Sequence, residues 1–215
     1  MGERCRNATR YVRRVDLAVI AIAFGAIFVV ELPDKTFVAA LVLSTRYRPL
    51  AVWVGVGLAF LVQTLIACTV GGLVTLLPHR VVEIVAGLIF LIGALLLLRE
   101  APKADAEEAE TEEEYAAKAA SPKSGLAAVG ASFLVLFAAE WGDLSQLLTI
   151  SLVGRYHQPV SVFVGAWGAL LVVSGLAVVA GRFLLRYLRL STIHYVGAAV
   201  CFLLAAVTTY QVVAG

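Results

Sequence analysis

The chain has 215 residues, of which 61% are hydrophobic and 15% are charged, and its mean hydropathy is +0.92. Soluble domains are roughly 45–50% apolar and about 25% charged. This composition therefore excludes an ordinary soluble protein and predicts an all-α polytopic protein surrounded by the lipid bilayer. The net charge of +2 hides a separation of basic and acidic stretches, and it gives no reason to expect a nucleic-acid partner.

Six apolar stretches are long enough to be transmembrane helices, since a helix needs roughly 20 apolar residues to cross a bilayer. In chain order we expect a basic tail, three helices, an acidic linker and three more helices: 1–14, 15–44, 50–77, 82–98, 100–124, 126–153, 160–181 and 193–213. The first helix should be interrupted at Pro33, because proline removes a hydrogen-bond donor and clashes with the preceding turn. Gly142 should loosen the fourth helix in a similar way. The distribution of Lys and Arg does not decide which side the amino terminus faces.

The linker at 100–124 is rich in glutamate and alanine and contains two prolines. Its composition predicts a solvated, charged tether, in part helical because Ala, Glu and Lys have good helix propensity. A role in attracting cations or in regulation is the alternative.

The two halves of the chain repeat one another, 15–99 against 125–215. At an offset of 109 residues Glu31 matches Glu140, and Asp34 matches Asp143. After one extra residue in a turn the offset is 110, and it matches Gly55 with Gly165 and then continues through later helices. Since three helices is an odd number, the second half must enter the membrane from the opposite side. We therefore expect two inverted three-helix repeats, with a site near the midplane where they meet.

Each half carries a pair of carboxylates inside an apolar stretch: Glu31 with Asp34, and Glu140 with Asp143. Ionised acids at membrane depth cost at least about 2.5–3.5 kcal/mol each, so they are normally functional or paired. The spacing of three predicts that the two acids of a pair share one helix face.

Further polar side chains accompany these acids. Thr36 and Ser145 offer hydroxyl oxygens as metal ligands, and the predicted accessory residues are Lys35, Gln146, Gln63, Thr64 and Ser174. The last three are equally explained by hydrogen bonds between helices. Three histidines fall near predicted turns, where we expect solvated side chains, with a proton-sensing role as the alternative: His79, His157 and His194.

The ligand set predicts a site for a hard divalent cation. If the repeats face one another, four carboxylates converge with hydroxyl and carbonyl oxygens, which suits Mn²⁺, Ca²⁺ or Mg²⁺ rather than Zn²⁺ or Cu⁺. With Lys35 counted, a divalent ion brings the formal site charge close to −1, and without the ion acids this close together hold protons. Metal entry then expels protons, and proton entry expels metal.

A structural ion pair is the simpler alternative for the first motif, because Glu31 and Lys35 are four residues apart with the acid first. In the second motif Leu144 stands where that cation would be, so Glu140 and Asp143 have no local basic partner.

Two copies of the pattern E-x-G-D-[KR]-[ST], in the first and fourth helices, resemble the transmembrane protein 165 family (uncharacterised protein family 0016). The resemblance covers about 17–99 and 126–213. It implies exchange of Mn²⁺ or Ca²⁺ for protons, with Glu31, Asp34, Glu140 and Asp143 as the functional acids. Pro33 and Leu144 depart from the family pattern, which has glycine and a basic residue at these positions. The site therefore has one basic side chain where the family pattern has two.

The sequence thus predicts a secondary transporter, and not an enzyme, with no bound cofactor and no catalytic residues. Its predicted substrates are protons and a divalent cation, for which Mn²⁺ is the first candidate and Ca²⁺ the second. An exporter of another small cation is the first alternative, and a membrane-embedded acid/base enzyme is the second. The composition favours a bacterial cytoplasmic (inner) membrane, and a homo-oligomer is compatible with it.

Overall fold

The computed structural model describes residues 15–32, 34–76, 78–119, 124–187 and 190–214, and the basic tail at 1–14 lies outside them. The described chain is α-helical with no strand, which confirms the predicted all-α class. Its helices are α2 (Leu17–Glu31), α3 (Lys35–Arg46), α4 (Pro49–Val74), α5 (His79–Glu100), α6 (Ala104–Lys118), α7 (Leu126–Ala139), α8 (Leu144–Tyr156), α9 (Pro159–Tyr187) and α10 (Leu190–Ala214).

Both helices that carry a carboxylate pair are broken. The axes of α2 and α3 meet at 71°, and those of α7 and α8 meet at 73°. The first break falls at the predicted place, although Pro33 itself lies outside the described residues. At the second break Gly142 has a φ of +83°, a conformation that side chains with a Cβ rarely adopt. The predicted interruptions at these two positions are confirmed.

Several helices are long and apolar enough to cross a membrane. Among the described residues these are Pro49–Val74, Arg80–Glu100 and Pro159–Val179. Counting each bent pair as one span gives up to five, and α10 adds a shorter apolar helix at His194–Tyr210. These lengths are compatible with the six predicted spans.

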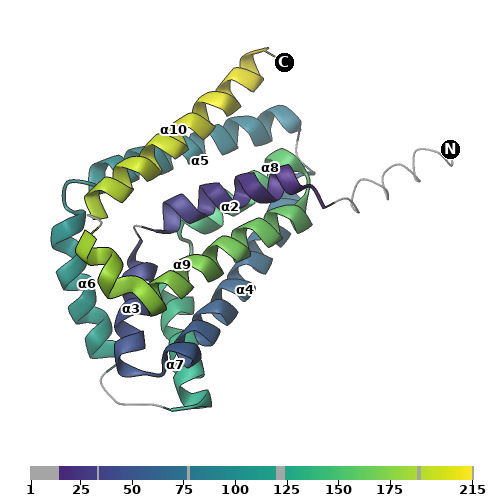
Figure 1. Cartoon of the computed structure of the whole chain (residues 1–215). Coiled ribbons are helices and arrows are strands. Elements are labelled where there is room, and N and C mark those ends of the chain that lie inside the picture. Colours follow the sequence, from purple (N-terminus) through teal and green to yellow (C-terminus); the bar gives the residue numbers. More distant parts are fainter. Residues whose placement is uncertain (1–14, 33, 77, 120–123, 188–189, 215) are drawn as a thin grey trace.

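The two halves pack against each other in a reciprocal way. A Cβ added to Gly55 of α4 would meet Val129, Ser132 and Phe133 of α7. A Cβ added to Gly165 of α9 would meet Ile20, Ala23 and Phe24 of α2. These three residues are the repeat equivalents, at an offset of 109, of the three that face Gly55. The second helix of each half therefore packs closely on the first helix of the other half (Figure 1).

The central helices α4 and α9 cross in antiparallel directions. The indole N–H of Trp53 donates to the carbonyl of Leu171 at 3.0 Å, and that of Trp167 donates to the carbonyl of Gly57 at 3.1 Å. Residue numbers increase along α4 from 53 to 57, while those of the bonded partners on α9 decrease from 171 to 167. A two-fold axis perpendicular to the helices gives such a pairing, so the packing is compatible with the predicted inverted repeats.

The acidic linker is more ordered than a solvated tether. Its residues 104–118 form α6, which packs along α3 at one side of the molecule (Figure 1). Ala104, Tyr115 and Ala119 lie on one face of this segment and are buried. The expectation of a solvated linker is therefore wrong for this face, since three turns of helix bring the apolar residues into register.

Candidate functional site

Both breaks begin a new helix with an aspartate at the N-cap. Asp34 Oδ1 accepts a hydrogen bond from the amide of Lys35 at 2.8 Å, and Asp143 Oδ2 accepts one from the amide of Ser145 at 3.1 Å. Aspartate is a preferred N-cap because its carboxylate satisfies amides that the helix leaves unpaired. The positive ends of the α3 and α8 dipoles therefore lie at the same two carboxylates.

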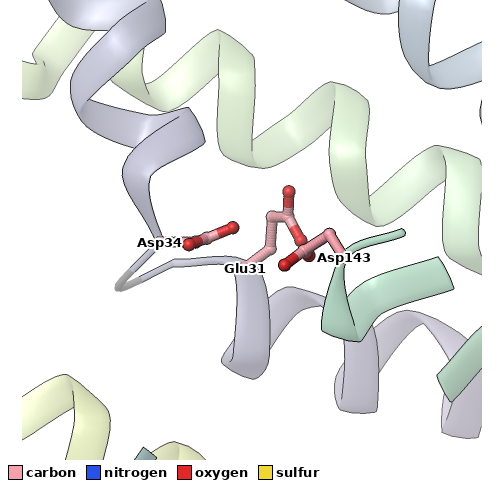
Figure 2. A group of neighbouring side chains, drawn as sticks. All are labelled: Glu31, Asp34 and Asp143. Carbon is pink, nitrogen blue, oxygen red and sulfur yellow. The ribbon is translucent and has the colours of Figure 1, made fainter. Parts of the chain in front are cut away.

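Three carboxylates from the two halves converge at the breaks. Glu31, Asp34 and Asp143 each offer an oxygen, and these oxygens all lie within 4.8 Å of one another. Figure 2 shows the three side chains pointing toward one another from the α2–α3 break and from the start of α8. Such a spacing suits oxygens that share one cation.

Glu31 is the most deeply placed member of this group. Its side chain is 0% exposed, and neither carboxylate oxygen has a hydrogen-bond partner among the described residues. Buried polar atoms are nearly always paired, and an unpaired one calls for an explanation such as an ion. The donor set of carboxylates and hydroxyls, without sulfur or imidazole in the group of three, fits a hard divalent cation as substrate.

A cavity of about 410 Å³ opens beside the three carboxylates. Both motifs line it, through Asp34 and Lys35 from the first and through Glu140 and Asp143 from the second. Glu140 is 4% exposed and lies outside the group of three, although it shares the cavity. Residues from both halves of the chain therefore line this cavity.

The prediction that each acid pair shares a helix face is wrong. Glu31 ends α2 and Asp34 caps α3, so they lie on opposite sides of a break, and Glu140 and Asp143 are arranged in the same way. The bend, and not the helical repeat, brings the acids of the first pair together.

The break also removes the structural ion-pair alternative. Lys35 begins a helix that points away from α2, its side chain is exposed, and it makes no ion pair with Glu31 among the described residues. The carboxylate group is therefore not neutralised by the lysine that the sequence placed four residues later.

The predicted hydroxyl residues differ in their hydrogen-bond partners. Thr36 donates to Asp34 Oδ2 at 3.4 Å, and Ser145 is buried next to Asp143, to which its amide donates. Ser174 donates to the carbonyl of Leu171 on its own helix at 3.2 Å. Thr64 is buried in α4.

Two predicted accessory residues bond to backbone carbonyls at the second break. Gln63 Nε2 donates to the carbonyl of Phe137 at 3.1 Å, and Gln146 Nε2 donates to that of Glu140 at 2.5 Å. Gln63, Thr64 and Ser174 do not line the cavity.

The cavity is also lined by polar residues that the sequence did not assign to the site, among them His194, Tyr115 and Glu100. His194, expected in a solvated turn, is 7% exposed and lines the cavity from α10, whereas His157 is exposed as expected. Tyr115 of α6 lines the same cavity at 4% exposure. Burial, together with the nearby Glu140 carboxylate, raises the pKa of the Tyr115 phenol, so its hydroxyl keeps its proton. Neither motif spacing nor composition signals Tyr115 or His194, because α6 and α10 reach the site only through packing.

Comparison with known proteins gives the family. The sequence profile of GDT1, described as a divalent cation/proton antiporter, matches residues 19–105 and 128–215. No solved structure matches the chain significantly.

Named relatives cover most of the chain. The chloroplastic protein PAM71-homolog of Arabidopsis thaliana is 31% identical over 211 residues, which is 88% of this chain and 58% of that protein. The GDT1-like protein sll0615 of Synechocystis is 32% identical over 196 residues, covering 87% of this chain and 95% of the relative. The chain thus spans somewhat more than half of the plant protein. These matches confirm the predicted resemblance to the transmembrane protein 165 family and exclude the enzyme alternative, and the chain belongs to the GDT1 family of divalent cation/proton antiporters.

Proposed function

We propose that this chain exchanges Mn²⁺, and with lower preference Ca²⁺, for protons across a membrane, at a site formed by the two helix breaks. The observation that carries the proposal is the convergence of Glu31, Asp34 and Asp143 within 4.8 Å, from both halves of the chain. Glu140, which lines the same cavity, completes the set as a fourth carboxylate.

The chemistry of exchange follows from charge. Three or four carboxylates in a site of low dielectric repel one another strongly when all are ionised. They are stable either with a divalent cation among them or with protons bound, so each substrate displaces the other. The exposed Lys35 at the cavity supplies one positive charge, which is too little to neutralise the group.

We expect Mn²⁺ and Ca²⁺ to be favoured over Mg²⁺, because the carboxylate ligands come from two separate helix breaks. Mg²⁺ requires near-ideal octahedral geometry at about 2.0–2.1 Å and gives up its water reluctantly, whereas Ca²⁺ accepts irregular cages with longer bonds. Carboxylates contributed by two separate helix breaks are expected to suit such an irregular cage better than a regular octahedron. Another small cation as cargo is the competing proposal, and the bacterial cytoplasmic membrane remains the proposed location.

Uptake into proteoliposomes with an imposed pH gradient tests the proposal. We expect the gradient to drive Mn²⁺ and Ca²⁺ movement, Mg²⁺ to move more slowly, and Asp143→Asn to abolish transport while the protein still folds. Metal movement without proton counterflow, or no divalent movement by folded protein, would overturn it. Selective movement of a monovalent cation would favour the competing proposal.

A further inference from the structure

The two breaks differ in how their freed carbonyls are satisfied. In the first half the amide of Leu32 still donates to the carbonyl of Phe28 at 3.1 Å, so the helical pattern continues past Glu31. In the second half α7 ends at Ala139, and no donation from Trp141 to the equivalent carbonyl of Phe137 occurs in the described structure. The second helix therefore ends one residue earlier and leaves a carbonyl to be paired by other means.

Gln63 supplies the missing donor from the opposite half of the chain. It is 3% exposed in α4, and its Nε2 donates to the carbonyl of Phe137 at 3.1 Å. This carbonyl is three residues before Glu140. At the position equivalent to Gln63, the second half has Val173 in α9, which has no side-chain donor for the first break.

Gln146 spans the same break from the other side. Its Nε2 donates to the carbonyl of Glu140 at 2.5 Å, and its Oε1 accepts from the amide of Gly142 at 3.4 Å. Both ends of the amide are thereby engaged with the backbone between the two acids. The equivalent residue of the first half is Phe37, which cannot form either bond.

The comparison explains why only one break needs amide side chains. The first break contains Pro33, whose ring fixes φ and whose nitrogen has no N–H to place. The second break contains Gly142, which leaves the backbone free to adopt many conformations. In the second half, side-chain hydrogen bonds must therefore hold the backbone conformation that the proline ring restricts in the first half.

We propose that Gln63 and Gln146 are positioning residues, which hold the 140–143 backbone in the shape that presents Glu140 and Asp143 to the transported cation. The inference rests on the proposed function, and it assigns the two glutamines to the geometry of the site instead of to direct coordination. Partners that orient ligating groups in this way typically contribute ten- to a hundredfold to metal affinity.

The test is the KM for Mn²⁺ in proteoliposomes, measured together with the maximal rate and with Mn²⁺ affinity from thermal unfolding in detergent. Gln63→Met and Gln146→Met keep similar length and remove the amide. We expect each to raise the KM and the dissociation constant by about tenfold, with the maximal rate within about twofold of the unmodified protein. Gln146→Met lies at the edge of the packed core, so it remains informative if Gln63→Met does not fold.

Val173→Ala is the matched control, because it alters the equivalent buried position of the second half, in α9, which offers no such hydrogen bond to the first break. We expect it to lower the unfolding temperature and to leave the KM unchanged. Glutamine variants that lose thermal stability with an unchanged KM would overturn the positioning role. If the unmodified protein neither binds nor transports Mn²⁺, it is the proposed function that fails.

Discussion

At the scale of single residues, the site depends on backbone shapes that few side chains tolerate. Gly142 has a φ of +83°, and a Cβ built there meets nothing within 4 Å. Its constraint is therefore conformational and not steric. The residue turns the chain between Glu140 and Asp143, so any strain placed on it is transmitted to both acids.

Gly142→Ala should destabilise the protein by about 1–2 kcal/mol, the cost of holding an L-residue in a left-handed conformation. Gly130→Ala is the control, since Gly130 lies within α7 with nothing within 4 Å of its added Cβ, and alanine favours the helix. Thermal unfolding in detergent compares them. A loss of stability as large for Gly130→Ala as for Gly142→Ala would contradict this explanation.

At the scale of helices, reciprocal packing of the two halves depends on two glycines. A Cβ on Gly165 would lie 2.5 Å from the backbone carbonyl of Ile20, and one on Gly55 would collide with that of Val129. A backbone atom cannot move aside without its helix. Gly165→Ala would therefore push α9 away from α2, and Gly55→Ala would push α4 away from α7.

Gly55→Ala and Gly165→Ala should each cost about 1–3 kcal/mol, the range for overpacked positions. The two losses should be similar, because the contacts are related by the repeat. Gly72→Ala, with open space around its Cβ, provides the control. Equal unfolding temperatures for all three variants would show that the helices do not approach as closely as the structure indicates.

The linker helix α6 covers one side of the cavity with an aromatic ring. Tyr115 is buried against the site, and Lys118 lies 4.8 Å above its ring while pairing with Glu114 at 2.6 Å. Removal of the ring should open a route for water to the cavity, whereas phenylalanine should keep it covered.

Tyr115→Ala should therefore increase the rate at which a water-soluble thiol reagent labels a cysteine placed at Val30, which is buried and lines the cavity. Tyr115→Phe is the matched control. The native Cys68 and Cys201 are buried, and Cys5 is replaced by serine in the background. Equal labelling of the Ala and Phe variants would mean that α6 does not limit access.

At the scale of the whole molecule, a bound cation should hold the two halves together, because the three converging carboxylates come from both repeats. Any ligand that binds only the folded protein stabilises it by mass action, by about 2.7 kcal/mol at a hundred times its dissociation constant. The unfolding temperature should rise with Mn²⁺ concentration, and Asp143→Asn should lose most of this rise. A rise that survives Asp143→Asn would place the stabilising ion elsewhere.

Much of this protein is determined by the sequence alone. Composition and long continuous apolar stretches dictate helices in a bilayer, because a helix satisfies all backbone hydrogen bonds within a single segment. The offset between Glu31 and Glu140 reveals the repeat, and proline and glycine next to the acids predict the breaks. These features depend only on residue identity and spacing along the chain, so no tertiary contact is needed to recognise them.

Tertiary structure decided what lies around the acids. The bends of 71° and 73° separate the two acids of each pair onto different helices, which a regular spacing of three could not reveal. Tyr115, His194 and Gln63 reach the region of the site from helices distant in sequence. Such contacts depend on the direction in which each helix leaves its break, and that direction is set by packing between the halves and not by any short stretch of residues.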